Sequence, residues 1–103
     1  MKFLVISRPG SNLPQLPSSG YVDLAKGSKK WLDDMIAKGT AECGYALHNH
    51  GGVLILNAKS HEDVHGMLVN HPLHAFYNWE IEPLLDADQT HKQNIKYLTS
   101  LAA

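Results

Sequence analysis

Hydrophobic and polar residues alternate with two different periods along the chain, and these periods predict its elements. The run Phe3–Ser7 is mostly apolar and predicts a buried strand. Residues 40–48 and 53–56 predict two further strands, and the turn residues 49–52 between them favour a hairpin. Side chains alternate again over 75–82, which predicts a last strand.

Helical periodicity occupies the segments between these strands. Residues 21–38 repeat apolar side chains every three or four positions and predict a helix, with Gly39 at its C-terminal cap. A second helix is predicted over 61–70, where Ser60 and Asp63 have the spacing of a capping box. The stretch 89–101 predicts a last helix, with Asp86 or Asp88 as its N-cap and Ile95, Leu98 and Leu101 as its apolar stripe.

The order of these elements predicts an α+β fold. Strand, helix, strand, strand, helix, strand is the ferredoxin-like β-α-β-β-α-β order, here followed by a C-terminal helix. It gives a four-stranded antiparallel sheet with both main helices on one face. The other face carries apolar as well as polar groups, so we expect two copies to place these faces together as a dimeric α+β barrel with an internal cavity. The Pro- and Ser-rich segment 8–20 is predicted to be a long loop, of the kind that forms lids or binding segments.

Composition narrows the function further. The chain has 103 residues and is predicted to be a single domain, 1–103. Its net charge of −1 gives no basic field for nucleic acid, and its apolar runs are too short for a membrane span, so neither partner is expected. The lone Cys43 fits a reducing compartment. These features predict a cytoplasmic protein.

Strand parity separates core positions from candidate site positions. In the last strand, Tyr77, Trp79 and Ile81 share a face made only of aromatic and aliphatic side chains, which predicts a core face. The opposite face is predicted to carry Phe76, Asn78, Glu80 and Glu82. In the second strand, Cys43, Tyr45 and Leu47 are predicted to face the core, and His48 to share the other face with Glu42. Cys43 is therefore expected to be an inert buried thiol.

Two stretches carry a resemblance to a known family. Met67-Leu-Val-Asn-His-Pro-Leu73 and Trp79-Glu-Ile-Glu-Pro-Leu84, together with the element order, resemble the muconolactone isomerase-like family of dimeric α+β barrels. The YciI-like and cofactor-free monooxygenase barrels share this architecture. The resemblance implies an enzyme without a cofactor that shifts a double bond by proton transfer in a small lactone or carbonyl acid. It also implies a homodimer or higher homo-oligomer. The loop 8–20 and the histidines at 48, 50, 71 and 74 depart from the family pattern.

The candidate chemistry is acid–base chemistry. We expect His48 and Glu80 to exchange protons with the substrate, since an imidazole titrates near neutrality and an enclosed carboxyl group can carry a proton. Arg8, the only arginine, is expected to hold an anionic end of the substrate, and Asn78 to orient a carbonyl. The remaining candidate binding residues are Phe76, His50, His71 and His74. The alternative for each charged residue is an exposed surface position.

Other readings of the chain remain open. His61 and His65 have the four-residue spacing of a helical metal site, but no third ligand is evident, so no metal is predicted. A cofactor-independent monooxygenase or a polyketide cyclase would use the same architecture. A non-catalytic ligand-binding or oligomerisation module is the third possibility, because a fold does not fix a function.

Overall fold

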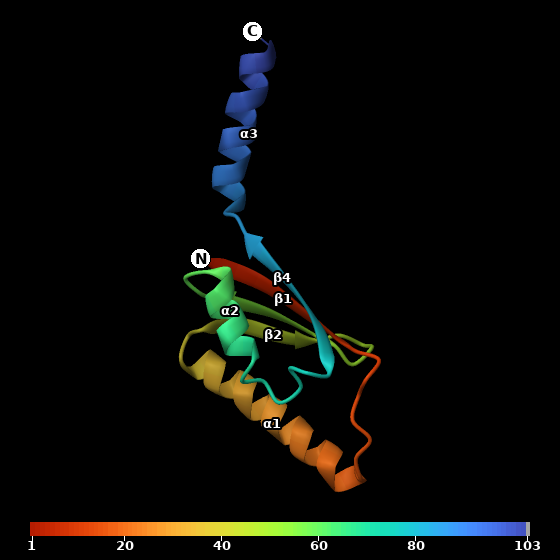
Figure 1. Cartoon of the computed structure of the whole chain (residues 1–103). Coiled ribbons are helices and arrows are strands. Elements are labelled where there is room, and N and C mark those ends of the chain that lie inside the picture. The colour runs from red at the N-terminus through yellow and green to blue at the C-terminus, as the bar shows by residue number, and fades with distance from the viewer. Residues whose placement is uncertain (103) are drawn as a thin grey trace.

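The computed structural model describes residues 1–102 and confirms the predicted order of elements (Figure 1). A four-stranded sheet carries two helices on one face, and a third helix follows the last strand. The elements are β1 (Lys2–Pro9), α1 (Ser18–Ala37), β2 (Ala41–Ala46), β3 (Gly52–Asn57), α2 (His61–Leu68), β4 (Tyr77–Leu84) and α3 (Ala87–Ala102).

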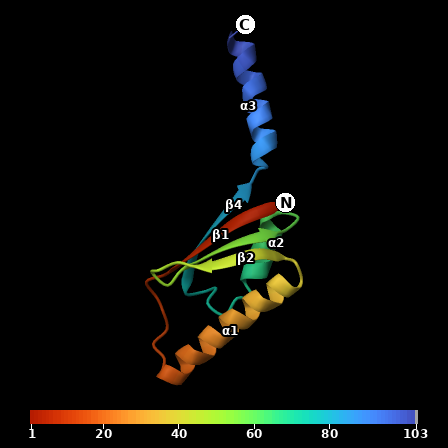
Figure 2. The same ribbon diagram turned by 180° about the vertical axis from the view of Figure 1, so that it is seen from behind.

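The sheet has the order β2-β3-β1-β4, and every neighbouring pair is antiparallel. In the central strand β1, Ile6 pairs with Val53 of β3 on one side and with Glu80 of β4 on the other. The two views related by a half turn show α1 and α2 on the same side of the sheet (Figures 1 and 2). The ferredoxin-like α+β fold predicted from the sequence is therefore confirmed.

The hydrophobic core lies between the sheet and these two helices. Phe3, Val5 and Leu56 from the strands and Val64 and Leu68 from α2 are all at most 2% exposed. The longer helix α1 contributes only partly buried side chains, namely Trp31, Leu32 and Met35. Helix α1 therefore closes over the sheet less tightly than α2 does, which leaves room beneath it.

The predicted faces of the second strand are wrong. Tyr45 is 70% exposed, and Cys43 is only half-buried rather than a core thiol. The cause is a bulge between Ala41 and Cys43, where the pairing with β3 skips a residue. Such a bulge reverses the alternation beyond it, so Gly44 faces the helices and Tyr45 faces away.

Two segment boundaries also differ from the prediction. Strand β1 continues to Pro9 and α1 begins at Ser18, so the loop spans only residues 10–17. The Tyr21 hydroxyl group holds this loop, since it donates to the Pro14 carbonyl at 2.8 Å and accepts from the Leu16 amide at 3.1 Å. Strand β4 begins at Tyr77, two residues later than predicted, which leaves Phe76 in the preceding turn.

Local signals at the helix ends are confirmed. The Ser60 hydroxyl group accepts from the Asp63 amide at 3.1 Å, which is the predicted cap of α2. Gly39 follows α1 with φ of +75°, a left-handed conformation that glycine adopts without strain. Asp86 rather than Asp88 caps α3, because its carboxylate accepts from the Gln89 amide at 2.9 Å. Among residues 1–102, no helix is both long enough and apolar enough to cross a membrane.

Candidate active site

A cleft of about 390 Å³ lies between α1 and the helix-facing side of the sheet. Its walls come from three parts of the chain: α1, the sheet, and the segment between α2 and β4. The side chains that matter most for its chemistry are Trp31 from α1, His71 and Leu73 from the segment after α2, and Tyr77 and Trp79 from β4. Most of this wall is apolar, so a bound ligand would place its own apolar surface against it.

Two glycines allow the walls of the cleft to approach each other. A Cβ atom on Gly27 would lie 3.1 Å from Pro72 Cγ, so glycine lets α1 approach the segment after α2. A Cβ atom on Gly44 would lie 2.8 Å from Leu32, so the second glycine lets the same helix lie close to β2. A glycine inside a helix weakens that helix, and at Gly27 the close packing explains its presence.

His71 is the chemically distinctive group in the cleft. Its ring centroid lies 4.9 Å from that of Trp31 and 5.2 Å from that of Trp79, both in edge-on geometry. Burial, together with the nearby His74, lowers the pKa of His71 to about 4. The imidazole is therefore neutral at pH 7. Its Nδ1 accepts from the Leu73 amide at 3.0 Å, so the proton of the neutral ring is assigned to Nε2.

The neighbouring aromatic groups fix the position of this histidine. Trp79 Nε1 donates to the His74 carbonyl at 3.1 Å, which ties β4 to the segment that carries His71. The His74 ring lies over Trp79 with centroids 6.3 Å apart and an interplanar angle of 24°. Trp31 Nε1 and His74 Nδ1 are buried and have no hydrogen-bond partner among residues 1–102.

His50 lies at the rim of the same cleft. It has φ of +68° in the tight turn between β2 and β3, and its side chain is exposed. Its carbonyl oxygen accepts from the Tyr77 hydroxyl group at 2.9 Å, which joins the turn to the start of β4. At Gly51, a Cβ atom would lie 2.1 Å from the Ser7 carbonyl oxygen, so only glycine fits there.

Most of the other predicted site residues lie outside this cleft. Arg8 and Glu80 form an ion pair at 3.6 Å, with both side chains 58% exposed. Arg8 also lines a separate hollow of about 360 Å³ with His48 and Asn49. His48 lies in the turn beyond β2, because that strand ends at Ala46. The structure thus places both members of the predicted catalytic pair beside Arg8.

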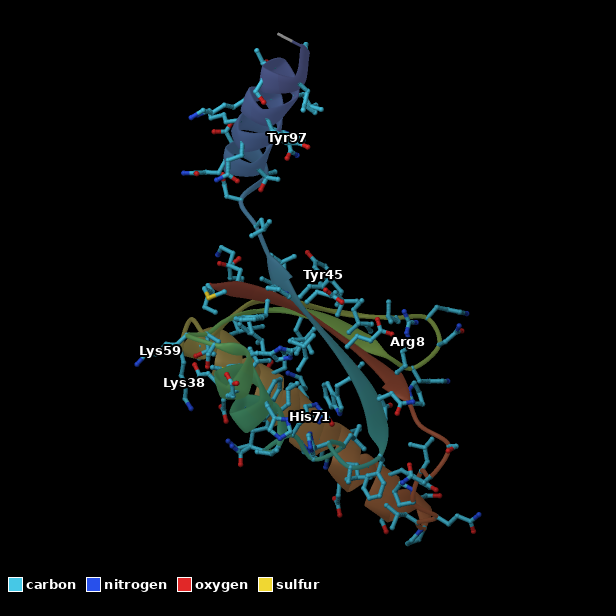
Figure 3. The ribbon with its side chains drawn as sticks, turned by 45° about the horizontal axis from the view of Figure 1, so that its top comes forward. Arg8, Lys38, Tyr45, Lys59, His71 and Tyr97 are labelled. Atoms are coloured by element: carbon cyan, nitrogen blue, oxygen red, sulfur yellow. The ribbon has the colours of Figure 1, made fainter. Side chains whose placement is uncertain are left out.

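The sheet separates these two regions. In Figure 3, Tyr45 lies on one side of the sheet and His71 on the other, toward α1. Asn78 and Glu80 alternate with Trp79 along β4 and are exposed. Of the residues predicted from the sequence, His50 and His71 line the cleft, and the ring of His74 stacks on that of Trp79. Phe76 lies in the turn before β4, where its carbonyl oxygen accepts from the Gly10 amide at 2.9 Å.

His61 and His65, the pair with the spacing of a helical metal site, are both exposed on α2. His61, Glu62 and His65 line a shallow hollow of about 340 Å³ on α2. Within residues 1–102, no group of three or more His, Cys, Asp or Glu side chains has the geometry to hold a metal ion. His65 instead lies edge-on to His74, with ring centroids 5.6 Å apart.

Sequence reasoning missed the two tryptophans as walls of the site. Trp31 belongs to the apolar repeat that predicts the helix over 21–38, and Trp79 to the predicted core face of the last strand. Both side chains do pack against the core. Two features of the sequence could have indicated the site. His71 and His74 lie on either side of Pro72, with Trp79 a few residues later, and the predicted helix over 21–38 has a glycine, Gly27, in its interior. The alternation of side chains along a strand does not show that the helix-facing side of the sheet contains a cleft.

Comparison with solved structures places this arrangement in a known fold class. Muconolactone isomerase superposes with a TM-score of 0.71 over 84% of this chain and 90% of its own, at 19% sequence identity. The 5-chloro-2-hydroxyhydroquinone dehydrochlorinase of Burkholderia phenoliruptrix, in complex with 2,5-dihydroxybenzoquinone, has a TM-score of 0.64 over 86% of this chain and 98% of its own, at 18% identity. No family model and no curated protein matches the sequence.

The fold and the cleft define a ferredoxin-like α+β domain with a cavity beneath its first helix. More particularly, the chain has the muconolactone isomerase-like fold, as its sequence resemblance predicted. At these identities the likeness establishes the fold alone.

Proposed function

We propose that this protein is an enzyme that moves a proton within a small, unsaturated, oxygenated ring compound and so shifts a double bond, without a cofactor. The observation that carries the proposal is a neutral histidine, His71, held between two indoles in a mostly apolar cleft of about 390 Å³. The names of the two structural neighbours support the substrate class, since one acts on a lactone and the other on a hydroxylated aromatic ring.

His71 would act on the oxygen of the substrate rather than on its carbon. With Nδ1 engaged by the Leu73 amide, the ring offers its Nε2–H as a hydrogen-bond donor. A neutral imidazole can stabilise the enolate oxygen that forms when a proton is removed next to a carbonyl group. The mostly apolar surroundings lower the local dielectric constant and so strengthen that hydrogen bond.

His50 is the proposed carrier of the migrating proton. His50 lines the cleft and is exposed, and an imidazole can take up a proton at one carbon and return it at another. The flat walls formed by Trp31 and Trp79 would hold a planar ring by stacking. The reaction is balanced within the substrate, since the proton removed from one carbon is delivered to a second carbon.

Ligand binding in the cleft can be measured with the intrinsic fluorescence of the protein. The chain has two tryptophans, and both line the cleft. We expect 2,5-dihydroxybenzoquinone or muconolactone to change the tryptophan emission in a saturable way. Added ligand that leaves the emission unchanged, while binding is detected by calorimetry, would place the site elsewhere, for example at Arg8.

Turnover of muconolactone, followed by ultraviolet absorbance, tests the assignment of His71. We expect His71→Phe to lower kcat by roughly 100-fold or more, because one positioned donor to an oxyanion is worth about that much. His71→Gln keeps an N–H group and is expected to retain part of the activity.

The matched controls are the residues outside the cleft. His48→Gln and Glu80→Gln should stay within about threefold of the wild-type kcat, a range that corresponds to well under 1 kcal/mol. A collapse of activity in these two variants, with His71→Phe unaffected, would move the chemistry to the other face of the sheet. Oxygen uptake during turnover of a phenolic substrate would identify a monooxygenase instead.

A further inference from the structure

The cleft beneath α1 carries a single formal charge. Among residues 1–102, the side chains that line it include one lysine, Lys29, and no arginine, aspartate or glutamate. The lining also has two histidines, His50 and His71. Burial, together with His74, lowers the pKa of His71 to about 4, and an ordinary imidazole is neutral at pH 8. At that pH the cleft therefore presents one ammonium group, and no carboxylate, to a ligand.

Lys29 lies beside the apolar wall of the cleft rather than within it. Ser28, Trp31 and Leu32 line the cleft from the same helix, and Lys29 is at the edge of the face that they share. Its side chain lines the cleft and is nevertheless 76% exposed, so it lies at the opening. A lysine stem can pack along an apolar surface while the ammonium group stays in water. A ring bound in the cleft would meet this ammonium group through a substituent that points toward solvent.

The ion pair that Lys29 makes within the chain is easily exchanged. Its Nζ lies 2.6 Å from Oδ2 of Asp33, one turn further along α1. Both side chains are well exposed, and water screens such a pair so strongly that it contributes little to stability. Asp33 itself does not line the cleft. A carboxylate on a ligand can therefore share the ammonium group with Asp33, or replace Asp33, at low cost.

The other candidate cation lies in a different region. Arg8 does not line the cleft and pairs with Glu80 at 3.6 Å on the open face of the sheet. A substrate bound in the cleft would therefore find its counter-charge on α1 rather than at Arg8.

We propose that Lys29 binds the anionic end of the substrate, and that the cleft selects ring compounds with one carboxylate group over neutral ones. This inference rests on the function proposed for the cleft and names the substrate class. The ring lies against the apolar wall near His71, and its carboxylate points toward the opening. Lys29 contacts a part of the substrate that does not react, so it determines specificity through binding and leaves the proton transfer to other groups.

The next residue along α1 provides a matched control. Lys30 pairs with Asp34 at 2.8 Å with the same four-residue spacing, and its side chain is 78% exposed. It does not line the cleft, because one residue turns the helix by about 100°. The two lysines thus share their helix, their type of partner and their exposure, and they differ in whether they line the cleft.

Binding of two matched ring compounds to the full chain at pH 8 tests the inference. 2-Furoate and 2-furamide have the same ring and differ in charge. The NMR signals of the indole N–H groups report binding in the cleft, because both tryptophans line it. We expect the wild type to bind 2-furoate about fivefold more tightly than 2-furamide, which corresponds to about 1 kcal/mol. High salt should reduce this preference by screening the charges.

Variants at the two ion pairs locate the charge that is responsible. Lys29→Gln should abolish the preference for 2-furoate, and Lys29→Arg should keep most of it. Asp33→Asn breaks the same ion pair but should tighten 2-furoate binding by about twofold, because the ammonium group loses a competing carboxylate. Opposite effects of Lys29→Gln and Asp33→Asn would not follow from a loss of helix stability. Lys30→Gln and Asp34→Asn should each leave the Kd within about twofold of wild type, as expected for screened charges outside the cleft.

Two kinds of result would overturn the inference, and they differ in what they say about the cleft. Indole signals that shift with both compounds at equal affinity, or a preference that survives Lys29→Gln, would refute the role of Lys29 and leave the proposed site in the cleft standing. Indole signals that neither compound shifts would count against the proposed site itself, and the role of Lys29 would fail with it.

Discussion

The two faces of the sheet give ionisable side chains very different surroundings. On the covered face, His71 lies between two indoles, and burial together with His74 lowers its pKa to about 4. On the open face, Arg8 and Glu80 lie 3.6 Å apart, and each side chain is 58% exposed. Adjacent residues of β4, Trp79 and Glu80, belong to these two environments. Coverage by α1, rather than the presence of charged residues, therefore creates the chemically distinctive environment.

The difference follows from solvation. An exposed ion pair is screened by water, and such a pair typically contributes 0–1 kcal/mol. Burial deprives an imidazolium ion of the water that would stabilise its charge, so a partly buried imidazole stays neutral. The open face has more residues of the types used in acid–base catalysis, whereas the covered face has His71, whose pKa is lowered. This contrast between the two faces supports the site proposed in the cleft.

The largest expected effect on stability separates neighbouring residues of β4. Trp79→Ala should lower the free energy of unfolding by about 3 kcal/mol, because it removes a partly buried indole and its hydrogen bond to the His74 carbonyl. Asn78→Ala, on the open face, should change it by less than about 0.5 kcal/mol. Urea denaturation measures both values. Equal losses would show that the open face is packed as tightly as the cleft.

The sequence predicted the covered face better than the open one. The alternation of Tyr77, Trp79 and Ile81 with polar residues is regular, so the core side of β4 was predicted correctly. In β2 the bulge at Ala41 and Cys43 reversed the faces of Cys43 and Tyr45, and no residue there signals a bulge.

The site was harder to predict than the fold. Burial lowers the pKa of His71, and the rings packed beside it belong to Trp31 and Trp79, which are 48 positions apart in the sequence. A periodic pattern places each of them in the core, and only the packing of α1 brings them to either side of one histidine. His48 and Glu80 were singled out as acid–base types with suitable parity. How far water reaches these two side chains depends on what covers the open face, and the alternation of residues along one strand does not indicate that.

A second, smaller effect should appear in the pH dependence of stability. An unfolded histidine has a pKa near 6.5, and His71 has one of about 4 in the folded protein. Between these values the unfolded state binds a proton that the folded state does not, so acidification favours unfolding. The stability that the neutral ring contributes is fully present above pH 6.5 and is lost as the pH falls toward 4.

Thermal or urea unfolding at several pH values measures this loss for the wild type and for His71→Gln. We expect the wild type to lose roughly 1–2 kcal/mol more than the variant between pH 6.5 and 4, once solvent screening is discounted. His50→Gln, which alters an exposed side chain at the rim, serves as the control and should follow the wild-type curve. Parallel curves for the wild type and His71→Gln would mean that the cleft does not hold His71 neutral.

The smallest expected effect concerns the ion pair on the open face. A double-mutant cycle with Arg8→Met and Glu80→Gln should give a coupling free energy below about 0.5 kcal/mol, which high salt should weaken further, because both side chains are well exposed in the single chain. The result also bears on the dimer expected from the sequence, in which a second copy covers this face. If a second copy covers this face at high protein concentration, the pair loses water and its coupling should grow with concentration. A coupling above 1 kcal/mol at a concentration where the protein is monomeric would show that the open face protects charge within one chain, and the contrast between the two faces would then fail.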